Sequence, residues 1–253
     1  MRISKIGLAC FFLILLAMYV IQSKSGILFS SGQKDAVPNV SWQIDGKRGS
    51  VSFTLQNEKG EPLRTIGENE QNKFVVCIMN NMLKQCEDVK PTYIGNGTFT
   101  FQHVFIQNTT LFLYIKDQET RQELAKKELV IGPANDKQTP LTVDALLTSN
   151  IGPYPASLQF SMLKANRKES IAIQIQSEED LTNISPSGEV SRLLIVDEKL
   201  THLISVVPQS NKPGRQITFD VTFPEEGNYK LMGTFYLNGK TYLKSYVVKV
   251  AKG

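Results

Sequence analysis

The runs in which apolar and polar side chains alternate constrain the fold of this chain most strongly. Such runs include Val51–Leu55, Phe99–Phe101 and Ile217–Phe223. Because successive side chains of a strand point to opposite faces, this alternation is typical of half-buried β-strands. Asn238–Gly239 stands between two further runs and is a sequence signal for a two-residue hairpin. The pattern predicts an all-β fold.

The chain also repeats itself. An apolar run occurs in each half, at Lys73–Ile78 and at Arg192–Val196, and about 25 residues later each half has an alternating strand. A turn, a further strand and a closing strand follow in both halves. Two units of about 100 residues with about six to eight strands each predict two tandem immunoglobulin-like β-sandwich domains. Helical periodicity is limited to two short candidates, Val143–Leu147 and Glu178–Asn183.

The uncharged run Ile6–Ile21 predicts an N-terminal membrane-directing helix. As a helix it would be about 24 Å long, and Lys5 and Lys24 can lengthen the span by reaching toward the headgroups. The residues that follow lack a good small-residue cleavage site, which favours a signal anchor, although Ser30–Gly32 keeps cleavage and secretion as the alternative. Basic residues before the run favour a cytoplasmic N-terminus. We therefore expect a single-pass protein of the cell membrane whose bulk is extracytoplasmic.

These patterns predict five parts. The expected boundaries are a signal anchor or signal peptide at 1–24, a tether at 25–40, a first sandwich at 41–132, a linker at 133–141 and a second sandwich at 142–253.

Charge excludes one class of partner. The chain has 28 basic and 24 acidic side chains and a formal charge of +4. Residues 1–24 hold three of the basic side chains and no acid, so 25 basic and 24 acidic side chains remain in the exported part. A nucleic-acid surface needs clustered Lys and Arg, so we expect no nucleic-acid partner.

Cys77 and Cys86 predict a disulfide. A hairpin centred between Asn81 and Met82 would place the two cysteines directly opposite each other, with Cβ atoms about 4.5–5.5 Å apart. An oxidising exterior permits the bridge. The alternative is a pair of free thiols.

The remaining residues offer little chemistry. The two histidines, His103 and His202, stand in different halves, where we expect a structural residue and a surface loop residue. The chain has no G-x-S-x-G motif. We therefore expect no catalytic, cofactor-binding or metal-binding residues, no cofactor and no enzyme activity, with an unrecognised hydrolase as one alternative. Tyr229 opens a strand soon after a glycine turn, which is typical of a structural tyrosine corner.

The second half resembles a known family. Leu193–Leu203, Pro208 and Phe219–Leu231, which contains an F-P-x-x-G-x-Y turn, are similar to the YtkA-like exported β-sandwich domains of bacilli. The resemblance implies an immunoglobulin-like envelope module and links it to metal handling. Family members typically carry two histidines before the proline, whereas this chain has Ser205 and Val207 there.

We therefore expect a non-enzymatic binding or assembly module of the bacterial cell envelope, held in the membrane by residues 6–21 and acting on a protein partner. The alternative is a copper-handling protein of the YtkA-like kind with degenerate sites.

Overall fold

The computed structural model describes residues 39–45, 48–63, 72–80, 86–106, 109–118, 123–132 and 140–253. The predicted membrane segment 1–24, nearly all of the tether and most of the linker lie outside these residues. No helix capable of spanning a bilayer occurs in the described part of the chain. Pro38–Gly253 forms one compact unit.

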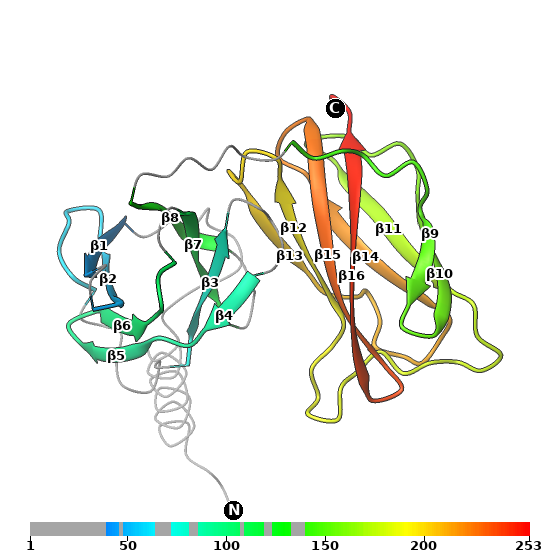
Figure 1. Cartoon of the computed structure of the whole chain (residues 1–253), viewed down its shortest axis with the longest axis horizontal. Helices are drawn as coiled ribbons and strands as arrows, with labels where there is room; N and C mark the ends of the chain where they lie inside the picture. Colours follow the sequence, from blue (N-terminus) through cyan, green and yellow to red (C-terminus); the bar gives the residue numbers. More distant parts are fainter. Residues whose placement is uncertain are drawn as a thin grey trace, which may run out of the picture. The chain divides into compact units, whose positions relative to one another are not determined.

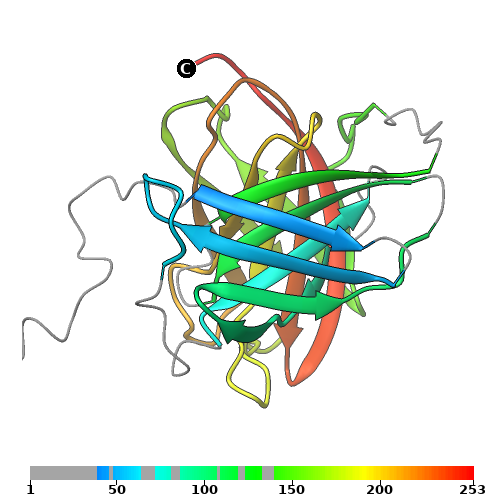
Figure 2. The ribbon, with the colours of Figure 1, turned by 90° about the vertical axis from the view of Figure 1, so that its left-hand side faces the viewer.

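The first half folds into two antiparallel sheets, with strand orders β1-β2-β6-β5 and β4-β3-β7-β8. Figure 2 shows the first sheet lying across the second. Alternate side chains of each sheet fill the space between them: Val51, Phe53 and Leu55 from β2 pack with Phe74 and Val76 from β3. The strands are β1 (Asn39–Asp45), β2 (Ser50–Gln56), β3 (Phe74–Asn80), β4 (Cys86–Val89), β5 (Thr92–Gly95), β6 (Thr98–Gln102), β7 (Thr109–Asp117) and β8 (Glu123–Ile131).

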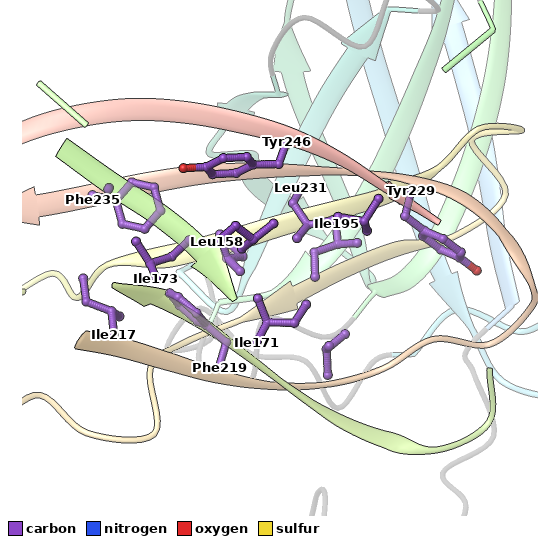
Figure 3. Close-up of a cluster of buried hydrophobic side chains, with 14 of the residues drawn as sticks. Leu158, Ile171, Ile173, Ile195, Ile217, Phe219, Tyr229, Leu231, Phe235 and Tyr246 are labelled. Atoms are coloured by element: carbon purple, nitrogen blue, oxygen red, sulfur yellow. The ribbon is translucent and has the colours of Figure 1, made fainter. Parts of the chain in front are cut away.

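The second half has the same construction, with sheets β14-β11-β10-β9 and β13-β12-β15-β16 (Figure 1). Its core lies between these sheets, and Figure 3 shows Ile173, Phe219, Leu231 and Phe235 within it. The strands are β9 (Thr148–Ile151), β10 (Tyr154–Phe160), β11 (Lys168–Ile175), β12 (Arg192–Asp197), β13 (Leu203–Val206), β14 (Gln216–Thr222), β15 (Gly227–Leu237) and β16 (Lys240–Val250). The described residues therefore form two β-sandwiches.

The two sandwiches share most of their topology. The β4-β3-β7-β8 sheet corresponds strand by strand to β13-β12-β15-β16, and β1-β2-β6 corresponds to β10-β11-β14. The apolar runs that suggested a repeat fall on β3 and β12, which occupy equivalent positions. The remaining strands differ, because β5 adds to the sheet beside β6 whereas β9 adds beside β10. A common core of seven strands therefore underlies both halves.

The Asn-Gly signal for a two-residue hairpin is confirmed. Leu237 pairs with Lys240, and Asn238 and Gly239 both have positive φ, 48° and 76°, as a type I′ turn requires.

The two short helix candidates are wrong. Asp144 donates its backbone N–H to Val247, and Leu181 exchanges backbone hydrogen bonds with Gly214. Pairing with another segment thus takes up backbone groups that a helix would use internally. The first strand also begins at Asn39, inside the predicted tether.

Candidate functional site

β3 and β7 are buried on both faces. Their inward side chains, such as Val76 and Leu113, belong to the core of the first sandwich. Their outward side chains pack against residues around β12 and β13 of the second sandwich. We call this second set the junction cluster. It consists of Cys77, Met79, Phe112, Tyr114, Val196, Leu200 and Leu203.

A hydrogen bond joins two members of the junction cluster. The Tyr114 hydroxyl donates to the backbone carbonyl of Leu200 at 2.8 Å, and both residues are fully buried. Burial raises the pKa of Tyr114 well above its usual range, and the nearby Glu123 and Asp197 carboxylates raise it further. The phenol is therefore a protonated donor at every physiological pH.

Leu200 has an unusual backbone conformation. Its φ is +57°, a region that leucine rarely adopts and that costs about 1–2 kcal/mol. Its N–H donates to Asp197 at 3.0 Å and closes the turn after β12. Such strain persists only where surrounding contacts offset it. The buried side chain and the bond from Tyr114 provide those contacts.

A carboxylate makes a second polar link. Glu123 Oε2 of β8 accepts a hydrogen bond from the backbone N–H of Leu203 at 3.0 Å. Burial raises the pKa of Glu123, and the hydrogen bond from Leu203 and the charge of Lys126 partly offset that effect. Apolar packing and these two hydrogen bonds to backbone groups therefore help to join the two sandwiches.

The structure contains the Cys77–Cys86 disulfide, with Cα atoms 5.5 Å apart. The predicted register is nevertheless wrong, because Cys77 pairs with Asp88 and Met79 pairs with Cys86. β3 itself continues to Asn80, where it pairs with Leu111 of β7. A shift of two residues keeps every side chain on its face. The cysteines therefore still meet, on the face that bears the junction cluster.

Three charged residues lie beside the disulfide. Lys116, whose side chain is 3% exposed, places its Nζ 2.8 Å from Asp88 Oδ1. Arg192 comes from the second sandwich, and its Nη2 lies 3.6 Å from Asp88 Oδ2. A buried ammonium group needs an anionic partner to offset the loss of hydration. Asp88 is therefore the anionic partner of two cationic side chains, one from each sandwich.

A pocket of about 230 Å³ opens beside these charges. It lies where the outer face of the β4-β3-β7-β8 sheet meets the outer face of β13-β12-β15-β16. Both apolar and polar side chains surround it. The lining residues are Cys86, Asp88, Lys116, Arg192, Leu194, Ser205, Met232, Gly233, Thr234, Leu243, Lys244 and Ser245.

Sequence reasoning missed this pocket. The one available signal in the sequence was the charged residue Lys116, which directly follows the apolar run Leu111–Ile115. Ser205 lines the pocket, whereas Val207 is about half exposed.

The histidines lie in separate environments. His103 Nδ1 is 3.8 Å from Glu87, and its ring contacts Phe105. His202 Nδ1 is 3.9 Å from Asp197, in the other sandwich. In the described ranges, the one group of potential metal ligands is Cys77, Cys86 and Asp88. The two sulfur atoms are joined to each other, so they offer no thiolate to a metal ion.

Tyr229 forms the expected corner. Its hydroxyl donates to the backbone carbonyl of Glu225 at 2.9 Å, and its ring packs edge-on against Phe223. The contacts of this residue are therefore structural ones within the second sandwich.

A family model described as a domain of unknown function (DUF8832) matches residues 149–252. None of the curated proteins matches the chain.

Three solved structures are similar to parts of it. A predicted lipoprotein from Bacillus anthracis is 14% identical, with a TM-score of 0.29, and the match covers 44% of this chain and 88% of that one. The chicken CNTN1 FN1–FN3 domains are 11% identical, with a TM-score of 0.26, over 85% of this chain and 66% of that one. A segment of two fibronectin type III domains from chicken tenascin is 9% identical, with a TM-score of 0.25, over 84% and 98%.

Proposed function

We propose that this protein is a non-enzymatic binding module of the bacterial cell envelope, anchored by its N-terminal segment, with two immunoglobulin-like sandwiches that together hold a protein partner outside the cytoplasm. The observation that carries the proposal is the junction cluster. Tandem domains that serve only as spacers need few contacts with each other, and interfaces between domains are usually polar and mobile. Here Tyr114 and Leu200 are fully buried between the sandwiches.

A packed junction has a functional consequence. Sandwiches held in one orientation present a single composite surface, so a partner that contacts both avoids the entropic cost of ordering them. The pocket beside Arg192 belongs to that surface, because both sandwiches line it. The described histidines contact carboxylates rather than a serine or cysteine nucleophile, which supports binding over hydrolysis.

Partner capture tests the proposal. The tagged full chain is crosslinked in membranes of its own bacterium, and captured proteins are quantified by mass spectrometry. The control carries residues 1–40 fused to an unrelated sandwich, so that it shares the membrane segment but lacks the composite surface.

We expect one envelope protein to be enriched at least tenfold over this control and to bind the full chain again after purification. Equal capture of general chaperones by both proteins would count against the proposal.

A further inference from the structure

The pocket at the junction has an apolar floor and a charged end. Strand register places Leu194 beside Met232, and Met232 beside Ser245, on the outer face of the sheet. Next to these residues, strand register places Arg192 beside Thr234, and Thr234 beside Leu243, on the same face. Leu194 and Met232 also pack against the junction cluster, and this contact holds the floor in place.

Arg192, at the charged end of the pocket, lies too far from Asp88 for a direct hydrogen bond. Asp88 lies 2.8 Å from Lys116 but 3.6 Å from Arg192. The longer distance exceeds the range of a direct N–H···O hydrogen bond, about 2.7–3.2 Å. Within the described part of the chain, Asp88 is the single carboxylate that Arg192 contacts. The guanidinium therefore has N–H donors available to another acceptor.

Exposure places Arg192 at the entrance. Its side chain is 31% exposed, whereas that of Lys116 is 3% exposed. A ligand can therefore reach the guanidinium directly, whereas the Lys116 ammonium group is buried against Asp88. A planar guanidinium binds a carboxylate through two parallel hydrogen bonds, which a lysine cannot reproduce.

We infer that this pocket binds a carboxylate carried on a short aliphatic stem, such as the C-terminal residue of a polypeptide partner, with the carboxylate on Arg192 and the stem on Leu194 and Met232. The inference rests on the proposed function and names the group that the partner presents. The volume of about 230 Å³ is below the ~300–1,000 Å³ of pockets for drug-sized molecules, so it accommodates the end of a chain rather than a large ligand.

Isothermal titration calorimetry of the full chain in detergent tests the inference with four probes. N-acetyl-L-leucine has both the carboxylate and the stem. Its methyl amide lacks the carboxylate, and inorganic phosphate lacks the stem. The fourth probe, 4-methylpentanoate, keeps the acid and the stem but has no peptide group, so it separates a peptide terminus from a free aliphatic acid as the source.

Two variants and one matched control complete the experiment. Arg192→Gln removes the charge, and Met232→Phe crowds the floor without changing charge. Arg215→Gln is the control, because Arg215 is also paired with one carboxylate but lies away from the pocket. We expect each pocket variant to weaken N-acetyl-L-leucine binding at least tenfold and the control to change it less than twofold. If Arg192→Gln lowers the thermal stability of the junction, Met232→Phe still tests the site.

Several results would overturn the inference. They are the absence of N-acetyl-L-leucine binding at 20 mM, equal binding of its methyl amide, equal binding of phosphate, or unchanged affinity in both pocket variants. Tighter binding of 4-methylpentanoate than of N-acetyl-L-leucine would reject a peptide terminus as the source. None of these results depends on the capture of an envelope protein, so specific capture without probe binding would reject the pocket ligand and leave the proposed function standing.

Discussion

Replacing Tyr114 by Phe removes one hydroxyl group from the junction cluster. That hydroxyl donates to the carbonyl of Leu200 at 2.8 Å, between residues with no measurable exposure. Since water cannot reach the carbonyl, the variant leaves a buried acceptor unsatisfied, which costs about 1–3 kcal/mol. Leu200 at φ +57° also loses one of the contacts that offset its strain. We expect the free energy of unfolding to fall by about 2 kcal/mol.

Urea unfolding of the full chain measures this loss with two probes. Trp42 is the single tryptophan and packs against the core of the first sandwich, so its fluorescence follows that half. Far-UV circular dichroism follows both halves. We expect the two transitions to coincide in the wild type and to separate in Tyr114→Phe, because a weakened junction no longer couples the sandwiches.

Tyr229→Phe is the matched control for the same chemical change. The hydroxyl of Tyr229 also donates to a backbone carbonyl, but the acceptor belongs to Glu225, which is exposed, so water can replace the bond. We expect a loss of about 0.5–1.5 kcal/mol and no separation of the transitions. If Tyr114→Phe costs no more than Tyr229→Phe and its two probes still coincide, the assigned role of the junction bond is wrong.

Three further changes test other parts of the structure. Without reductant, the denatured chain should show one alkylatable thiol by mass spectrometry, and mutation of Cys77 and Cys86 to Ser should cost about 2–3 kcal/mol in denaturant unfolding; three thiols in the untreated chain would contradict the disulfide. Burial raises the folded-state pKa of Glu123, so its contribution to stability is fully present below the unfolded pKa and is lost as pH rises through the folded value. The melting temperature of the wild type should therefore fall over this pH range, whereas that of Glu123→Gln should not show this fall. Parallel profiles of melting temperature against pH for the two proteins would refute the assigned pKa shift. Gly152→Ala should lower the melting temperature, because φ is +58° and a Cβ atom would lie 2.2 Å from the Tyr242 ring. An unchanged melting temperature would contradict this steric conflict between Cβ and the ring.

Local patterns in the sequence predicted the features that depend on neighbouring residues. Alternation located strands such as β2 and β14, and Asn-Gly located the turn between β15 and β16. The glycine turn before Tyr229 indicated the corner whose hydroxyl returns to Glu225. Backbone preference and the two-residue period of a strand are encoded over a few positions, which is why these predictions succeed.

Features that depend on distant pairing were predicted only in part. The spacing of Cys77 and Cys86 indicated the bridge, but the β3–β4 register differs by two residues from the expected one. The apolar run in β3 indicated the repeated unit, although its composition does not distinguish the face in the core from the face at the junction. The helix candidates failed where contacts with other segments override short-range periodicity.

The sequence by itself therefore determined the strand content, the repeated unit and the pair of cysteines, because each of these follows from residues that are close in the chain or from their parity. Only the tertiary structure decided which outer faces meet. Tyr114 reaches Leu200 across 86 positions, and Arg192 reaches Asp88 from the other sandwich. Such contacts depend on the packing of two complete sheets, and an apolar or charged residue on the outer face of a strand carries no local signal of the surface it will contact.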